Sequence, residues 1–218
     1  MSKDTLWLLR FTYKKLKEKL TVSDSKKLFH EKFPYVIPGL YKKIVDEMLV
    51  ELNLLNHQNE FEQDYLFCVG LTETFKELTK GYKPYEHLDL LFESLCGSTN
   101  FKAKEIKEIS QKSQEEFKNK SSNDLLKLIK DKSDAKLYPS RILNLGMYVL
   151  ISNCQDIEGK NESEVNMIIS NIFESLNLSK NKAEKDIGIY KSTISKMEQA
   201  KELVEELRIK DKNKDQKK

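Results

Sequence analysis

The sequence predicts an all-α protein, a multi-helix bundle followed by a long C-terminal coiled-coil-like helix. Only 7 of the 218 residues are glycine and 4 are proline, about half of the share that is usual in globular proteins. Few turn-forming residues exclude sandwiches, barrels and other folds made of many short strands. Over most of the chain, apolar residues also recur three and four positions apart, which is the spacing of one helix face.

The first element is a basic amphipathic N-terminal extension over residues 1–20. It combines six basic residues with two acidic ones. Leu9, Tyr13, Leu16 and Leu20 fall on one helical face, as in helices that lie on a membrane surface. A frayed extension, or a start codon upstream of Met1, is the alternative.

A helical bundle domain is predicted over 21–178, and its first half contains four helices. Each begins at a capping or first-turn residue, ends near a proline or glycine, and is apolar at helical spacing in between. The four helices cover Ser23 to Phe33, Pro38 to Leu55, Asp64 to Lys80 and Tyr85 to Cys96.

The second half of the bundle domain is less regular. A charged stretch with few apolar residues covers 101–120, and Ser121-Ser122-Asn123-Asp124 caps a short helix that contains Leu125 to Ile129. Arg141 to Cys154 is apolar around nearly its whole circumference, so we expect it in the centre of the bundle. Val165 to Leu176 is a further amphipathic helix.

One long helix is predicted over 179–209, where apolar residues are spaced three and four apart without a proline. The pattern resembles a coiled-coil seam that Lys201 interrupts. A helix docked on the bundle and a free coiled coil both fit this pattern. Residues 210–218 are predicted to be a basic disordered tail.

The charge is unevenly distributed along the chain. The net charge of the whole chain is +3, whereas 1–20 and 208–218 each carry +4, which leaves −5 for 21–207. Because a charge acts only over about one Debye length, the two basic ends predict contact with an anionic surface, either a nucleic acid or an anionic bilayer.

No catalytic, cofactor or metal site is predicted. His30, His57 and His87 form no Glu-x-x-His or His-x-x-x-His pair, and no glycine-rich phosphate loop occurs. Glu47 and Glu51 lie one turn apart on a helix that also carries two lysines, and solvated ion pairs explain them. We therefore expect a protein that is not an enzyme; a helical enzyme whose site is assembled from distant residues is an alternative.

The three cysteines predict buried free thiols and a reducing compartment. Cys68, Cys96 and Cys154 are far apart, lie among apolar residues and form no Cys-x-x-Cys pair. The sequence contains no signal-peptide or transit-peptide pattern, and no apolar stretch is long enough for a transmembrane helix.

Several short groups of residues, spread over about 20–209, form a recognisable pattern through their order and spacing. They are Thr21-Val22-Ser23-Asp24-Ser25-Lys26, Pro38-Gly39-Leu40-Tyr41-Lys42-Lys43-Ile44-Val45-Asp46-Glu47, Val69-Gly70-Leu71, Gly81-Tyr82-Lys83-Pro84, Leu145-Gly146-Met147-Tyr148, Asp186 with Tyr190, and Met197-Glu198-Gln199-Ala200. Together they resemble the thylakoid formation protein family, also known as the photosystem II biogenesis factor family. Residues 1–20 lie outside the resemblance, and 101–135 match it poorly.

The resemblance implies an all-helical, non-enzymatic accessory protein without cofactors that associates peripherally with thylakoid membranes. Members of the family support thylakoid biogenesis and photosystem II assembly or repair, and they are linked to the membrane-bound FtsH protease. The missing transit peptide favours a cyanobacterial member. We therefore expect a cytoplasmic adaptor for the FtsH protease complex, held at the cytoplasmic face of the anionic thylakoid membrane.

A basic helical nucleic-acid-binding or regulatory protein is the alternative function. Nucleic-acid binding normally gathers arginines and stacking aromatic residues in one patch. This chain has only three arginines, and its basic ends lie outside the aromatic-rich core. No nucleic-acid partner is therefore expected.

Five residues within the matching groups are candidates for partner binding: Tyr41, Asp46, Tyr82, Tyr148 and Tyr190. Tyrosine buries a large area at interfaces while its hydroxyl stays polar. The alternative is that these tyrosines lie in the core or at helix junctions. Gly146, also in a matching group, permits a close helix approach, and Gly81 and Pro84 shape a turn.

Overall fold

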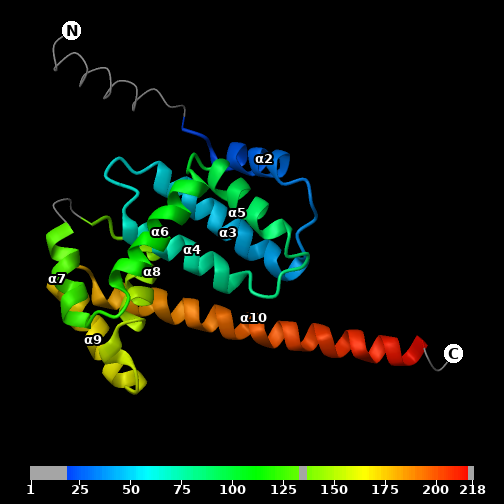
Figure 1. The fold of residues 1–218 in the computed structure, drawn as a ribbon. Helices are drawn as coiled ribbons and strands as arrows, with labels where there is room; N and C mark the ends of the chain where they lie inside the picture. Colours follow the sequence, from blue (N-terminus) through cyan, green and yellow to red (C-terminus); the bar gives the residue numbers. More distant parts are fainter. Residues whose placement is uncertain (1–18, 133–136, 216–218) are drawn as a thin grey trace, which may run out of the picture.

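The all-α class is confirmed by the computed structural model, which describes residues 19–132 and 137–215, with side chains as far as residue 207. Within this part of the chain it contains nine α-helices, one short 3-10 turn and no strand (Figure 1). The helices are α2 (Val22–Lys32), α3 (Gly39–Asn56), α4 (Tyr65–Leu78), α5 (His87–Gly97), α6 (Ala103–Phe117), α7 (Ser122–Lys132), α8 (Arg141–Ser152), α9 (Glu162–Ser175) and α10 (Lys180–Asp215), and η1 (Gln155–Ile157) follows α8. The predicted N-terminal extension falls almost entirely outside the described residues.

Helices α4 and α8 form the centre of the bundle, as predicted for the apolar helix that begins at Arg141. They pack on each other more extensively than any other pair. Gly70 and Gly146 lie where the two helices cross. A Cβ atom on Gly146 would lie 2.9 Å from the backbone nitrogen of Gly70 and closer still to the carbonyl oxygen of Leu66. Only glycine fits at this crossing, which confirms the close approach predicted at Gly146.

The remaining helices cover this central pair. α2, α3 and α5 pack on one another, α6 packs on α4 and α5, and α7 and α9 both contact α8. α10 runs along the bundle and contacts α4, α8 and α9. As Figure 1 shows, α7 and α9 lie at one end of the molecule, and the C-terminal part of α10 projects from the opposite end.

Two helix ends differ in detail from those predicted. The first helix is capped by Thr21, not by Ser23 or Asp24: Thr21 Oγ1 accepts from the backbone N–H of Asp24 at 3.1 Å, and the Asp24 carboxylate accepts from the N–H of Thr21 at 3.0 Å. Gly97, predicted to stop its helix, is the last residue of α5, and Asn100 adopts the positive φ that follows. Asparagine tolerates this conformation better than most residues.

Helix α10 is longer than predicted. It runs over 36 residues to Asp215, so residues 210–215, predicted to be part of a disordered tail, are helical. The physical reason is that no proline or glycine after Gly188 stops the helix. Met197 is buried against the bundle, whereas Leu203, Val204 and Leu207 are exposed. The helix thus packs on the bundle as far as Lys201, the residue that interrupts the coiled-coil-like pattern. Beyond Lys201 its apolar side chains are exposed.

The three cysteines are buried and unpaired, as predicted. Burial raises the pKa of the Cys68 and Cys96 thiols to about 12 and that of Cys154 to about 11. Among the residues described, no helix combines the length and the apolar character that a membrane crossing needs.

Candidate functional site: a groove along helix α3

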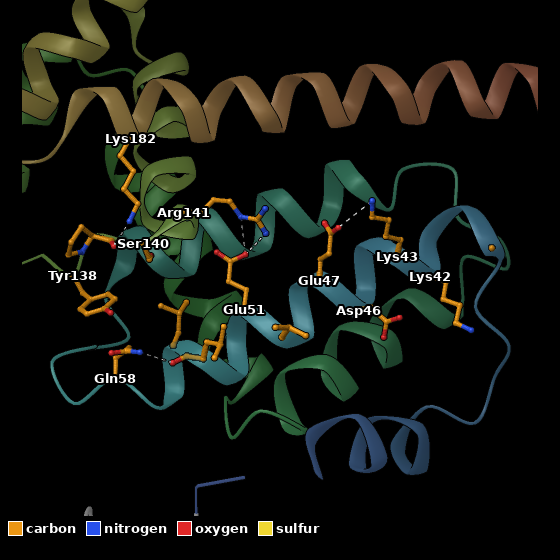
Figure 2. A pocket seen from close by; sticks show the side chains of 15 residues that line it. Lys42, Lys43, Asp46, Glu47, Glu51, Gln58, Tyr138, Ser140, Arg141 and Lys182 are labelled. Atoms are coloured by element: carbon orange, nitrogen blue, oxygen red, sulfur yellow. Dashed lines mark hydrogen bonds and ion pairs between the residues drawn. The ribbon is translucent and has the colours of Figure 1, made fainter. Parts of the chain in front are cut away.

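An open groove of about 940 Å³ follows the outer side of α3 (Figure 2). The opposite wall is the segment 138–141, which leads into α8, together with Lys182 in the first turn of α10. Charged side chains predominate along the N-terminal half of α3 and apolar side chains along its C-terminal half. The apolar lining is Val50, Leu54, Leu55, Tyr138 and Pro139, and the charged lining is Lys42, Lys43, Asp46, Glu47, Glu51, Arg141 and Lys182.

An ion pair between Glu51 and Arg141 joins the two walls. Nε of Arg141 donates to a Glu51 carboxylate oxygen at 3.0 Å, and an Nη donates to the same oxygen. Burial opposes the charge of the guanidinium, but the hydrogen bonds and charge of Glu51 outweigh it and raise the pKa of Arg141. The guanidinium therefore stays charged, and its hydrogen bonds to Glu51 fix the N-terminus of α8 against α3.

Two further hydrogen bonds hold the second wall in place. Ser140 caps α8, because its Oγ accepts from the backbone N–H of Leu143 at 3.1 Å. Lys182 Nζ donates to the carbonyl oxygen of Pro139 at 3.1 Å and ties the start of α10 to the same segment. The groove is thus shaped by three elements that are distant in sequence.

The charged rim of the groove consists of exposed ion pairs. Lys43 lies 3.8 Å from Glu47, one turn away on α3, and Lys26 of α2 lies 3.6 Å from Asp46. Pairs of this kind contribute little stability, because water competes for both partners. Their charges are therefore available to a binding partner. The solvated pair predicted for Glu47 is confirmed, whereas Glu51 pairs across the groove with Arg141.

A small hollow of about 50 Å³ lies beside the groove, between α3, α4, α8 and α10. Asn144 Nδ2 donates to the buried carboxylate of Asp186 at 2.8 Å. Thr74 Oγ1 also faces this region and is buried without a hydrogen-bond partner. No group of three or more His, Cys, Asp or Glu side chains in the described ranges is arranged to hold a metal ion.

The structure does not gather the five predicted partner-binding residues into one site. Tyr41, Tyr82 and Tyr190 are buried, with 4%, 0% and 7% of their surface exposed. The rings of Tyr41 and Tyr82 pack edge to face at 5.1 Å, and the Tyr41 hydroxyl donates to the carbonyl of Lys80 at 3.3 Å. This corrects the sequence prediction, because these three tyrosines fill helix junctions and offer no free surface.

The other two candidates stay partly accessible. Asp46 is half-buried and lines the groove. Tyr148 is half-buried on α8, where its ring lies 6.4 Å from that of Tyr190 and Lys191 Nζ lies 5.6 Å from its centre. Only Asp46 therefore belongs to the groove.

Several residues that shape the groove were not identified from the sequence. Arg141, Tyr138 and Lys182 are more than 80 residues away from α3, so no local spacing connects them to it. One signal was present: Arg141 is one of only three arginines in a chain that otherwise uses lysine. An arginine that directly follows a helix cap is suited to a fixed carboxylate contact.

Comparisons with known proteins agree with this all-helical architecture. The solved structure of Psb29 superimposes with a TM-score of 0.79 at 24% sequence identity, over 89% of this chain and 98% of that one. At this level of identity, the likeness concerns the fold.

The sequence comparisons identify the family. Protein Thf1 of Prochlorococcus marinus strain MIT 9312 is 78% identical over 199 residues, which are 91% of this chain and 99% of that protein. Protein Thf1 of Parasynechococcus marenigrum is 35% identical over 92% of this chain and 94% of its own length. Residues 21–218 also match the sequence model of the thylakoid formation protein family, so this chain belongs to that family.

Proposed function

We propose that this chain is a non-enzymatic accessory factor in thylakoid biogenesis and photosystem II assembly or repair, and that it acts as an adaptor for the membrane-bound FtsH protease complex. Membership of the thylakoid formation protein family supports the thylakoid role. The adaptor role is carried by one observation, the open groove along α3. Its mixture of apolar and charged side chains is typical of surfaces that bind another protein reversibly.

The apolar side chains of the groove would supply the contact area. Leu54 is 52% exposed within a lining that also contains Val50 and Tyr138. The surrounding ion pairs would orient the partner and speed its association, because exposed charges act mainly on the association rate. Asp46, the sequence candidate that lies in the groove, belongs to this rim.

Contact with the membrane would be peripheral and electrostatic. Residues 1–20 and 208–218 each carry a net charge of +4. A basic residue close to an anionic bilayer contributes about 1 kcal/mol, so either segment supports reversible recruitment to the cytoplasmic face of the thylakoid. High salt should release the protein. A membrane fraction that keeps it after a high-salt wash, without any bound partner, would contradict this part of the proposal.

Affinity capture of the tagged chain from gently solubilised thylakoid membranes, followed by mass spectrometry, tests the adaptor role. We expect FtsH subunits with the unsubstituted chain. Leu54→Asp places a charge in the groove on an exposed side chain, so the fold is retained while recovery of FtsH falls about tenfold or more. The matched control is Met167→Asp on α9, where the side chain is 60% exposed, and recovery should not change.

Two results would contradict the adaptor role. Equal recovery of FtsH by Leu54→Asp and Met167→Asp would remove the groove from the contact. Recovery of nucleic acid without FtsH, together with a salt-sensitive gel shift lost after deletion of 208–218, would favour the nucleic-acid-binding alternative.

A further inference from the structure

The end of the bundle from which α10 projects carries an unusual set of exposed side chains. Val36 is 91% exposed, Tyr35 is 47% exposed and Tyr85 is 59% exposed. Tyr35 and Val36 belong to the connection between α2 and α3, and Tyr85 belongs to the connection between α4 and α5. Figure 1 shows both connections at the same end of the bundle.

Contacts between the two connections hold them together. The ring of Tyr35 stacks on that of His87, the first residue of α5, with centroids 3.8 Å apart and an interplanar angle of 19°. Each connection also has a buried aromatic anchor, Phe33 in one and Tyr82 in the other. The exposed side chains are therefore presented on a fixed backbone and do not depend on the free ends of the chain.

The charges beside these side chains favour an anionic surface. The connection 33–38 contains no charged residue, and the segment 79–88 contains Lys80 and Lys83 against Glu86. Lys80 Nζ also lies 3.9 Å from Glu77 of α4, an exposed pair of the kind that binds weakly, whereas Lys83 lies within the connection itself. The methylenes of Lys201 on α10 lie next to Gly81, which belongs to the connection between α4 and α5. Tyrosine and lysine around an exposed aliphatic side chain are the residues that occupy the interface of a bilayer.

We propose that the tip formed by Tyr35, Val36 and Tyr85, with Lys80 and Lys83 around it, inserts into the interface of an anionic lipid bilayer. A folded protein partner fits this tip less well. Three side chains on two protruding connections provide only a small part of the roughly 800 Å² that a stable protein interface buries on each side. A bilayer needs only a few inserted apolar side chains and nearby cations.

The position of α10 agrees with this arrangement. Beyond Lys201 the helix extends from the same end of the bundle (Figure 1), and the sequence from 208 to 218 is strongly basic. A bilayer against the tip would therefore lie on the side toward which the basic C-terminus projects. The inference rests on the peripheral membrane contact of the proposed function and adds the surface that makes it.

A fluorophore attached to the tip tests the insertion directly. Val36→Cys in the full chain is labelled with an environment-sensitive dye, and the native thiols do not compete because all three are buried. With vesicles of phosphatidylglycerol and phosphatidylcholine, we expect a blue shift of the emission that high salt diminishes. The matched control is Met167→Cys on α9, at the opposite end, which should show no shift.

Sedimentation with the same vesicles measures the contribution of the tip. Val36→Glu removes one inserted side chain and adds one carboxylate, so the fraction bound should fall about tenfold or more. Lys83→Glu should act similarly, and vesicles of phosphatidylcholine alone should bind the unsubstituted chain weakly. Equal dye shifts at positions 36 and 167, or unchanged binding by Val36→Glu, would overturn the inference.

The outcomes separate this inference from the adaptor role. Vesicle binding that survives Val36→Glu but is lost on deletion of 208–218 would refute the tip and leave electrostatic recruitment intact. A tip that inserts in a chain that does not recover FtsH would refute the adaptor role alone. Loss of FtsH recovery with Val36→Glu, without any change in vesicle binding, would make the tip a protein contact and overturn the inference.

Discussion

Alanine at position 146 should destabilise the protein strongly, because the crossing of α4 and α8 has no space for a methyl group. The new Cβ would lie 2.9 Å from the backbone nitrogen of Gly70 and closer still to the carbonyl oxygen of Leu66. Ordinary contacts of a Cβ atom begin near 3.4 Å. Because both obstacles are backbone atoms of a buried helix, no side-chain rotation relieves the overlap, and the two helices must separate.

The magnitude follows from two opposing terms. Overpacking a core costs typically 1–3 kcal/mol and occasionally more, and a clash with backbone at the centre of the bundle belongs at the upper end. Alanine in place of glycine favours the helix by about 1 kcal/mol. We expect a net loss of about 2 kcal/mol, which lowers Tm by roughly 4–8 °C for a chain of this size.

Urea unfolding followed by far-ultraviolet circular dichroism measures this loss. The matched control is Gly188→Ala: this glycine is exposed within α10, and a Cβ atom there meets nothing within 4 Å. That variant should gain about 1 kcal/mol from helix propensity alone. Similar free energies of unfolding for the two variants would refute the reasoning, since the chemical change is identical and only the packing differs.

Three further predictions concern single contacts. Asp156→Ala should cost about 1–2 kcal/mol in urea unfolding, because the carboxylate accepts from the N–H and the hydroxyl of Ser122 at 2.7 and 2.6 Å and caps α7. Burial opposes the charge of Asp156, but these bonds outweigh it and lower its pKa. The stability difference between Asp156→Ala and the unsubstituted chain should therefore be full above the ordinary aspartate pKa of 3.8, and it should vanish as the pH falls through the lower pKa of the folded state. A thiol reagent at pH 8 should modify none of the three cysteines in the native protein and all of them in urea, and rapid native labelling would contradict their burial. Arg141→Met should destabilise more than the double substitution Arg141→Met with Glu51→Met, because the single change leaves a half-buried carboxylate without its cation; equal losses would argue against the pair.

Local features of the sequence predict the helices well. Proline, glycine and capping residues lie at or near most helix ends, and the apolar residues of Arg141 to Cys154 indicate a central helix, which α8 confirms. Periodicity reports which face of a helix is apolar and says nothing about the element that covers it. The partner of Gly146 at the helix crossing, Gly70, is 76 positions away, so its role emerges only from the folded chain.

The same limit explains the outcome for the candidate residues. A tyrosine in an amphipathic helix fits a core junction and a surface equally well, and Tyr82 meets Tyr41, 41 positions away, only in the folded chain. The spacing of Glu47 and Glu51 indicates a solvated pair on one helix, but the cation that Glu51 binds lies 90 residues away. Charge composition was also misleading for 210–215, because a lysine-rich segment without proline or glycine is compatible with helix as well as with disorder.

The groove and the proposed membrane-inserted tip are geometrically related, and this relation gives the last prediction. The groove begins at Gly39, directly after the connection that carries Val36, and continues to Gln58. α3 has 18 residues and so spans about 27 Å. With the tip on a bilayer, one end of the groove would lie near the membrane, and a segment of a membrane-anchored partner could enter there. Cross-linking from Lys42→Cys should therefore reach partner residues nearer to their membrane anchor than cross-linking from Gln58→Cys. The reverse order would show that the partner does not enter from the membrane side, and the tip and the groove would then act independently.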